Sequence, residues 1–282
     1  MATWAELEAG VVARLGNARE SHWLMERASG ARGAEWQLIR GEAAPARVEG
    51  FVDEMVDRRL AGEPLQYVLG EWSFRRLDLA IDRRVLIPRP ETEQVVEEAI
   101  GELRRLAVSA PTVVDLGTGS GAIALSLAFE VAGAQVWATD VSDSALTVAR
   151  SNLAGMGGMA ATRVRVVGGS WFDALPRELA GAVHLIVSNP PYVAEHEVTS
   201  LDPAVVDWEP ISALVPGPTG LEAIRHIVAG APLWLRRPGV LVVEIDPSQA
   251  DATIALARAA GFDEAEVRPD LAARPRTLVA RL

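Results

Sequence analysis

The chain has 282 residues, a length that predicts about two domains. Apolar residues make up 49% of the chain and charged residues 23%, a balance that excludes a disordered protein. The net charge of −11 disfavours a nonspecific nucleic-acid binder, and the absence of cysteine excludes disulfides, thiolate metal sites and cysteine nucleophiles.

Residues 1–71 are predicted to form a small helical domain. Apolar residues recur there at the three- and four-residue spacing of amphipathic helices, until Gly62 and Pro64 end the pattern. This part has no glycine-rich loop and no cluster of metal ligands, so packing alone or the docking of a partner explains it. The apolar stripes are Leu7, Val11, Val12 and Leu15; Trp23 and Leu24; Trp36, Leu38 and Ile39; and Phe51, Met55, Val56 and Leu60.

Residues 72–88 change to the two-residue period of strands. The pattern predicts one strand from Phe74 to Ile81 and a second from Val85 to Ile87, with a turn between them at 82–84. Prolines interrupt the chain directly afterwards. We therefore expect a β-hairpin linker over 72–88 and a second domain over 89–282.

The second domain alternates strand and helix from about residue 110. This alternation predicts a parallel sheet covered on both faces, with about seven strands. The stretch 193–216 is irregular, and long loops of this kind inside a domain are usually functional or disordered. The expected strands cover 113–116, 136–139, 164–167, 183–187, 239–245, 264–268 and 277–282, and the expected helices 122–129, 145–153, 221–235 and 249–260.

A glycine-rich loop follows the first strand of this domain. The segment from Asp115 to Gly121 reads Asp-Leu-Gly-Thr-Gly-Ser-Gly, and glycines allow the backbone to turn tightly and approach a ligand. Asp140 ends the next strand, where a carboxylate can accept hydrogen bonds from ribose hydroxyls. A nucleoside-bearing cofactor is therefore expected. The spacing from Gly119 through Ala124 also fits the fingerprint of nicotinamide and flavin dinucleotides. The glycines alone therefore do not distinguish a dinucleotide from a cofactor with a single nucleoside.

A second motif, Asn189-Pro190-Pro191-Tyr192, follows a later strand at the edge where open α/β sheets bind ligands. Proline has no amide donor, so the Pro190 carbonyl and the Asn189 side-chain oxygen remain as two acceptors for a planar NH₂ group. The Tyr192 ring can cover the face of that group. Acceptors on the two hydrogens stabilise the positive charge that develops if the nitrogen attacks the methyl group of a sulfonium compound. Holding the nitrogen in line with that methyl group supplies the rest of the rate acceleration. This chemistry requires no catalytic histidine, cysteine or metal.

The Asn-Pro-Pro-Tyr motif is shared with methyltransferases that modify amino groups of DNA and RNA bases, so it leaves the acceptor molecule open. Further blocks of sequence narrow the choice. They are Gly62–Gly70, Leu86–Glu93, Asp115–Gly121, Ser188–Tyr192, Glu209-Pro210 and Ala213-Leu214. With these blocks in this order from about residue 55 onward, the chain resembles the protein-glutamine methyltransferases that modify class I peptide chain release factors, the PrmC or HemK family.

This resemblance implies a fold and an activity. The fold is a class I S-adenosylmethionine-dependent methyltransferase, Rossmann-like, with the N-terminal helical domain docking the substrate. The reaction transfers a methyl group from S-adenosylmethionine to the side-chain nitrogen of the glutamine in a Gly-Gly-Gln motif of release factors. The family's cofactor-binding positions match Asp115, Gly117, Thr118, Gly119, Ser120, Gly121, Asp140, Trp171 and Asn189, and its catalytic and substrate-binding positions match Asn189, Pro190, Pro191 and Tyr192.

Some positions depart from the family pattern. Ser170 stands where an acidic or amide residue is expected, which puts recognition of the adenine amino group in doubt. His184 replaces an aspartate, and we expect a structural role for it. The segment Arg274–Arg276 replaces an expected Asp-Arg, so any role there is in doubt. Glu91 and Glu93 either approach the active site or begin a helix, where acidic residues are favoured.

Alternatives to a release-factor enzyme are an amino-methyltransferase acting on a glutamine of a ribosomal protein or on a nucleic-acid base, and a dehydrogenase-like or noncatalytic nucleoside binder. The acidic charge disfavours a nucleic-acid partner. The sequence lacks the ~18 consecutive apolar residues of a membrane span, and its acidic start does not resemble a secretory signal. We therefore expect a cytoplasmic monomer that binds neither membranes nor a metal.

Overall fold

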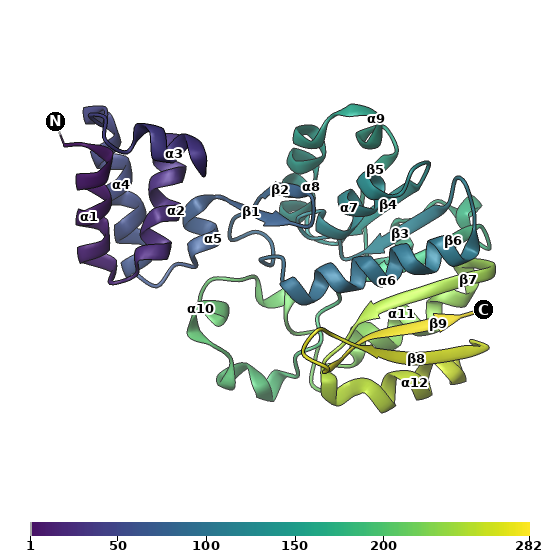
Figure 1. Ribbon diagram of the computed structural model, residues 1–282. Helices are drawn as coiled ribbons and strands as arrows, with labels where there is room; N and C mark the ends of the chain where they lie inside the picture. Colours follow the sequence, from purple (N-terminus) through teal and green to yellow (C-terminus); the bar gives the residue numbers. More distant parts are fainter. Residues whose placement is uncertain (1) are drawn as a thin grey trace. The chain divides into compact units, whose positions relative to one another are not determined.

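The computed structural model describes residues 2–282, and the chain divides into two compact units (Figure 1). The first unit runs to Glu71 and also includes Pro203–Trp208. The second comprises Trp72–Asp202 and Glu209–Leu282.

The first unit is helical, as predicted. Thr3 caps α1 in a capping box with Glu6, and Gly16 ends that helix in a left-handed conformation. Asn17 then caps α2. The helices are α1 (Trp4–Leu15), α2 (Ala18–Ser29), α3 (Ala34–Ile39), α4 (Ala46–Leu60), α5 (Leu65–Leu69) and the separate α10 (Pro203–Val206).

The core of the first unit is built from large apolar side chains on these helices. Trp4 and Trp36 meet edge to face, with ring centroids 6.0 Å apart. Leu24 and Met25 on α2 and Met55 on α4 are fully buried. Each of the predicted apolar stripes therefore contributes side chains to the interior, whereas Leu38, Phe51 and Leu60, which we had also placed on stripes, are exposed.

The β-hairpin forms earlier in the chain than predicted. Its strands are β1 (Glu71–Phe74) and β2 (Leu77–Ala80), joined through Arg75 in a left-handed conformation at φ 52°. A turn does form at 82–84, where the Val85 amide donates to the Asp82 carbonyl, but it joins no pair of strands, because no strand forms at 85–87 in the described chain. Val85 and Ile87 are nevertheless buried. The Ile87 amide donates to the side chain of Glu209, so this buried donor is satisfied without a neighbouring strand.

Within the described residues, the second unit contains a seven-stranded sheet in the order β5-β4-β3-β6-β7-β9-β8. The predicted parallel sheet holds from β5 to β7, but β9 is antiparallel to both of its neighbours. A short connection joins β8 to β9, and only antiparallel neighbours allow one. The strands are β3 (Thr112–Leu116), β4 (Gln135–Asp140), β5 (Val164–Gly168), β6 (Val183–Ser188), β7 (Leu235–Glu244), β8 (Glu264–Pro269) and β9 (Pro275–Arg281).

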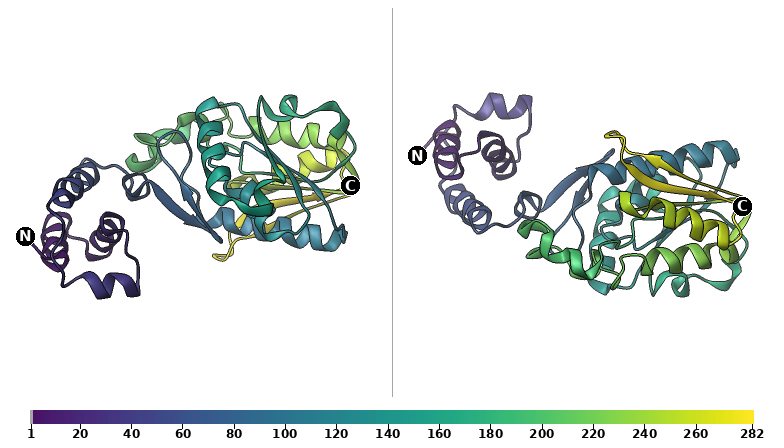
Figure 2. Two further views of the ribbon diagram at one scale, coloured as in Figure 1. Left: turned by 90° about the horizontal axis from the view of Figure 1, so that it is seen from above. Right: turned by 90° about the horizontal axis from the view of Figure 1, so that it is seen from below.

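Helices cover both faces of this sheet. Contacts link α6 to α7 and α7 to α8 on one face, and α11 to α12 on the other; Figure 2 shows α6 and the α11–α12 pair on opposite sides of the strands. We had predicted α6 only as one of two interpretations of Glu91 and Glu93, which lie in its first turn. The helices are α6 (Pro90–Leu106), α7 (Ala122–Glu130), α8 (Asp143–Met156), α9 (Gly158–Ala161), α11 (Glu222–Trp234) and α12 (Ala250–Ala259).

The strand order changes direction between β3 and β6. From β3 the chain continues to β4 and β5 on one side, whereas β6 and β7 lie on the other. Ligands bind in open α/β sheets at the carboxyl ends of strands that flank such a point. The glycine loop after β3, Asp140 at the end of β4 and the Asn-Pro-Pro-Tyr segment after β6 all meet there.

Candidate active site

The glycine loop turns the chain from β3 into α7. Gly117, Gly119 and Gly121 have φ values of 73°, 56° and 86°, in the left-handed region that favours glycine. The amides of Gly117 and Thr118 both donate to the Thr139 carbonyl on the neighbouring strand, which anchors the start of the loop. The loop therefore brings bare backbone to the edge of the sheet.

Asp115 lies beneath this loop and is fully buried. Its Oδ2 accepts hydrogen bonds from the Thr118 hydroxyl at 2.6 Å and from the Ala124 amide at 3.1 Å. Its Oδ1 accepts none from any described residue. Burial raises the pKa of Asp115 to about 7, against the lowering effect of those two bonds, and the negative charge of Asp140 adds to the rise. The carboxyl group thus has one buried oxygen that lacks a donor, where a cationic ligand group would be stabilised.

Asp140 binds two backbone amides with its two carboxylate oxygens. Oδ2 accepts from the Gly119 amide at 2.9 Å, and Oδ1 accepts from the Ser142 amide at 2.9 Å. Each oxygen still has a free lone pair, so the carboxylate is held in place and can accept further hydrogen bonds. It is partly exposed at the pocket edge.

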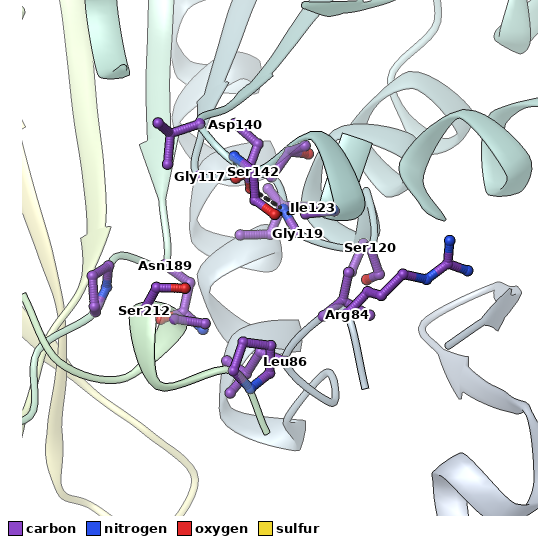
Figure 3. Close-up of a pocket in the computed structure, with 18 of the residues that line it drawn as sticks. Arg84, Leu86, Gly117, Gly119, Ser120, Ile123, Asp140, Ser142, Asn189 and Ser212 are labelled. Atoms are coloured by element: carbon purple, nitrogen blue, oxygen red, sulfur yellow. Dashed lines mark hydrogen bonds between the residues drawn. The ribbon is translucent and has the colours of Figure 1, made fainter. Parts of the chain in front are cut away.

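A pocket opens above these groups (Figure 3). The space inside it that holds no protein atom measures about 1070 Å³, part of it open to solvent. In Figure 3, Asp140 and Ser142 lie near Gly119, while Asn189 and Ser212 lie together on another side of the space. The lining residues are Arg84, Val85, Leu86, Pro88, Thr92, Gly117, Thr118, Gly119, Ser120, Ala122, Ile123, Asp140, Val141, Ser142, Ala145, Ser170, Trp171, Asn189, Pro191, Pro210, Ser212 and Ala213.

Trp171 forms part of this wall. It begins the short helix η1 (Trp171–Ala174) with a φ of 45°, an unusual conformation for a residue with a side chain. Its ring lies close to Gly117: a Cβ atom added to that glycine would come within 3.6 Å of the ring. Residues held in such conformations cluster at functional sites. Ser170 lines the pocket beside it.

The Asn-Pro-Pro-Tyr segment is tied to buried polar groups behind the pocket. Asn189 Nδ2 donates to the Thr92 hydroxyl at 3.1 Å, and the Tyr192 hydroxyl donates to Glu244 Oε1 at 3.3 Å. Thr92 also donates to Glu244 Oε2, at 2.7 Å. The segment is therefore held from α6 and from the end of β7.

The structure gathers most of the predicted site residues at one place. Gly117, Thr118, Gly119, Ser120, Asp140, Trp171, Asn189 and Pro191 line the pocket. The remaining four are not among its lining residues. Asp115 lies beneath the loop and Gly121 at the start of α7, while Pro190 is buried and Tyr192 partly buried beside Glu244.

Two segments of the pocket wall were not assigned to the site from the sequence, namely 84–88 and 210–213. Glu209 joins them. This buried carboxylate accepts from the Ile87 amide at 3.1 Å and pairs with Arg89. Burial raises the pKa of Glu209, while Arg89 and the Ile87 amide oppose the rise. Parts of both segments lie in the sequence blocks that carry the family resemblance, so the sequence did indicate that they matter. Their contact through Glu209 is formed only in the folded chain.

Two of the departures from the family pattern, His184 and the segment 274–276, have hydrogen-bond partners in the structure. His184 Nδ1 accepts a hydrogen bond from the Thr112 amide at 3.0 Å, which supports the structural role expected for it. Burial and the nearby Arg236 lower its pKa. Arg274 pairs with Asp270 and with Glu91.

The other arginine of that segment, Arg276, lies in β9, is buried and donates to the Ile245 carbonyl at 3.2 Å. Glu91 and Glu93 lie in the first turn of α6, outside the pocket lining. Their interpretation as the start of a helix is the one the structure supports, and the residue between them, Thr92, is the one that reaches the pocket.

Comparison with known proteins extends these observations. Residues 102–205 match the family described as Methyltransferase small domain, and residues 12–70 match the PrmC N-terminal domain. The release factor glutamine methyltransferase of Cereibacter sphaeroides is 39% identical over 94% of this chain and 91% of that protein. The protein of the same name from Deinococcus radiodurans is 40% identical over 93% and 90%. This chain belongs to the release factor glutamine methyltransferase family.

Solved structures of other methyltransferases share the fold seen here. The hMettl16 catalytic domain, solved in complex with MAT2A 3'UTR hairpin 6, superposes with a TM-score of 0.54 and 16% identity over 84% of this chain and 81% of that one. A methyltransferase from Pyrococcus furiosus gives 0.53 and 16% over 81% and 98%. The predicted α/β methyltransferase fold with a seven-stranded sheet is confirmed.

Residues 2–282 also bear on membrane insertion and metal binding. No helix there combines the length and apolar character that a membrane span requires. No group of three or more histidine, aspartate or glutamate side chains is placed to hold a metal ion.

Proposed function

We propose that this protein transfers the methyl group of S-adenosylmethionine to the side-chain amide nitrogen of the glutamine in the Gly-Gly-Gln motif of class I peptide chain release factors. The observation that carries the proposal is the position of Asn189. It stands at the carboxyl end of β6 on the wall of the same pocket as the glycine loop and Asp140, in a chain that belongs to this family.

The pocket suits S-adenosylmethionine. Asp115 Oδ1 is a buried oxygen without a donor beneath the glycine loop, which matches the ammonium group of the methionine part. Asp140 can accept from the ribose hydroxyls, and Trp171 offers a flat apolar surface to the adenine ring. Among the described residues α7 has no side-chain cap, so its start can receive the carboxylate.

The substrate amide needs help from the protein because its nitrogen lone pair is delocalised into the carbonyl. We assign Asn189 Oδ1 and the Pro190 carbonyl as acceptors of its two N–H bonds. The Tyr192 ring covers one face of the planar group and restricts its rotation. Each neutral hydrogen bond contributes only about 0.5–1.5 kcal/mol, so holding the nitrogen in line with the methyl group supplies much of the acceleration.

When bound, S-adenosylmethionine supplies an electrophilic methyl group on a sulfonium centre. As the nitrogen gains the methyl group, the bond from that group to sulfur breaks and S-adenosylhomocysteine leaves. The nitrogen becomes positively charged, and the hydrogen bonds from its two hydrogens to the acceptors become more favourable than in the ground state. The methylated nitrogen then loses one proton to solvent, because an N-protonated amide is a strong acid.

We assign a role to each part of the chain on the same basis. Residues 1–71 form the domain that docks the release factor, 72–88 form the linker, and 89–282 form the catalytic domain. The match of residues 12–70 to the PrmC N-terminal domain supports the first assignment. We propose that the enzyme acts in the cytoplasm, where release factors work, as a monomer without nucleic acid or membrane as a direct partner.

The test is mass spectrometry of a purified release factor after incubation with the enzyme and S-adenosylmethionine. We expect one methyl group on the Gly-Gly-Gln glutamine. The Asn189→Ala variant should transfer none while binding S-adenosylhomocysteine with nearly unchanged affinity, because Asn189 provides only one edge of the cofactor pocket.

Full activity of Asn189→Ala would overturn the assigned mechanism. An unmethylated release factor, together with labelled methyl groups on a ribosomal protein or a nucleic acid, would overturn the proposed substrate and keep the methyltransferase fold. Tighter binding of NAD than of S-adenosylhomocysteine would overturn the cofactor assignment.

A further inference from the structure

Three elements that are far apart in the sequence meet behind Asn189. Thr92 comes from the first turn of α6, Glu244 ends β7, and Tyr192 follows β6. The hydrogen bonds run from Asn189 Nδ2 to Thr92 Oγ1 at 3.1 Å, from Thr92 Oγ1 to Glu244 Oε2 at 2.7 Å, and from the Tyr192 hydroxyl to Glu244 Oε1 at 3.3 Å. Thr92 is 4% exposed and Glu244 1%, so water does not compete for these bonds.

The direction of these bonds is set by Glu244. An ionised carboxylate can only accept, so the single proton of the Thr92 hydroxyl must point toward Glu244. The lone pairs of Thr92 Oγ1 then face Asn189 and can only accept. The asparagine must therefore present its NH₂ group to Thr92, and its Oδ1 takes the opposite side.

The orientation of the Asn189 amide decides whether its oxygen or its NH₂ group faces the substrate. The two orientations of an asparagine amide have almost the same shape, and only the surrounding hydrogen bonds distinguish them. Asn189 Oδ1 accepts no hydrogen bond from any residue in 2–282, and Asn189 lines the pocket (Figure 3). With Oδ1 facing the pocket the residue accepts from a substrate NH₂ group. In the reverse orientation it would present a second NH₂ group and repel it.

We propose that Thr92 and Glu244 are positioning residues that hold the Asn189 amide with its oxygen toward the substrate. This inference rests on the proposed function. Through its other oxygen Glu244 also holds the Tyr192 hydroxyl. One buried carboxylate therefore orients both Asn189 and Tyr192, the two side chains that we place against the substrate amide.

Glu244 is ionised above about pH 7. Burial raises its pKa to about 7, while the bond from Thr92, the positive charge of Arg276 and the bond from Tyr192 oppose the rise, and Glu91 adds to it. Kinetics measured at about pH 8.5, above that value, keep the carboxylate charged.

Substitution of Thr92 tests the inference. Thr92→Val keeps the shape of the side chain but leaves the Asn189 NH₂ group without its acceptor. We expect kcat for release-factor methylation to fall roughly ten- to a hundredfold, while KM and the affinity for S-adenosylhomocysteine change less than about threefold. Thr92→Ser keeps the hydroxyl and should restore activity to within about threefold of the wild type.

Two more variants guard against a merely structural effect. Thr253→Val removes an equally buried hydroxyl, bonded to the Ala250 carbonyl in α12, and should leave kcat unchanged. Glu244→Gln can donate to Thr92 and so permits the reversed chain of bonds. It should lower kcat without altering cofactor binding, and it serves as the second variant if Thr92→Val does not fold.

A measurement independent of catalysis is available because the sequence contains only three asparagines, Asn17, Asn152 and Asn189. Side-chain ¹⁵N labelling of asparagine therefore gives three NH₂ signals, and the one lost in Asn189→Ala identifies the site. In Thr92→Val that signal alone should shift and its protons should exchange faster with water. Asn17 and Asn152, bonded elsewhere, serve as internal references.

The outcomes separate the two proposals. If the wild type methylates the release factor but Thr92→Val and Glu244→Gln keep full kcat, the inference fails and the proposed function stands. If the wild type methylates no release factor, the proposed function fails, and the NMR signals still decide the inference. An Asn189 signal that is the same in wild type and Thr92→Val overturns it.

Discussion

Asp115→Asn provides the sharpest test of the cofactor site, because the local geometry dictates how the new side chain must lie. The Ala124 amide and the Thr118 hydroxyl both donate to Oδ2. An asparagine at this position satisfies them only by turning its oxygen to that side. Its NH₂ group then occupies the position of Oδ1, the oxygen without a donor. The variant thus replaces an acceptor by a donor where we place the ammonium group of the cofactor.

The magnitude follows from the lost bond. A hydrogen bond to a charged group contributes about 1.5–3 kcal/mol, which corresponds to roughly a 10- to 150-fold loss of affinity for S-adenosylhomocysteine. The loss should exceed the lower end of this range, since the new NH₂ group also faces a positive charge. Because the variant is isosteric and keeps the two bonds within the loop, its thermal stability should change little.

Isothermal titration calorimetry against two ligands measures the effect. S-adenosylhomocysteine carries the amino-acid part, and 5′-methylthioadenosine carries only the nucleoside. Only the first ligand should lose affinity. Burial together with the charge of Asp140 raises the pKa of Asp115 to about 7, so the charge on this carboxyl is lost as the pH falls below that value. Wild-type affinity for S-adenosylhomocysteine should therefore fall below about pH 7, by up to about tenfold per pH unit, and the variant should show no such dependence.

Equal losses for the two ligands would refute this reasoning, because they would mean that the loop had collapsed. Unchanged affinity for S-adenosylhomocysteine in Asp115→Asn would show that Oδ1 does not meet the ammonium group. A pH dependence that persists in the variant would assign the titration to another group.

The other predictions concern the ribose site and the stability of the sheet edge. Asp140→Ala removes the partner of two amides and of the ribose, so affinities for S-adenosylhomocysteine and 5′-methylthioadenosine should fall together, roughly tenfold or more; a loss confined to one ligand would argue against ribose binding. Burial alone would raise the pKa of Glu102, but hydrogen bonds from Arg281 and Arg105 lower it to about 2 from 4.5, so its stabilising effect is complete above about pH 4.5 and is lost toward pH 2. Glu102→Gln should therefore lower the denaturant midpoint at pH 7 by the equivalent of about 1–3 kcal/mol, and its free energy of unfolding should depend less on pH between about 4.5 and 2 than that of the wild type. Glu264→Gln, which changes an exposed partner of Arg281, should have little effect.

The sequence by itself determined the local structure wherever the signal lies within a few neighbouring residues. The spacing of Val11 and Leu15 predicted a helix, and the glycines of 117–121 predicted a tight turn because few other residues tolerate positive φ. The strand–helix alternation predicted the sheet, and strand ends on one edge predicted that Asp140 and Asn189 would meet.

The tertiary structure decided features that depend on distant partners. The hairpin turn lies at Arg75 and not at 82–84, since the chain after the 82–84 turn pairs with no strand and its Ile87 amide donates to Glu209, far along the chain. The apolar pattern of that segment is the same whether it forms a strand or an extended segment that lines the pocket, so no local signal distinguishes the two.

The same reason explains why Thr92 and Glu244 went unnoticed beside Asn189. A threonine in a first helical turn and a glutamate at a strand end are unremarkable on their own, and 152 positions separate them in the sequence. Packing of α6 on the sheet brings the hydroxyl to the carboxylate in a place without water, where each polar group must find a partner. Chemistry within one motif can be deduced from neighbouring residues, whereas the orientation of a side chain in that motif depends on groups that only the folded chain brings together.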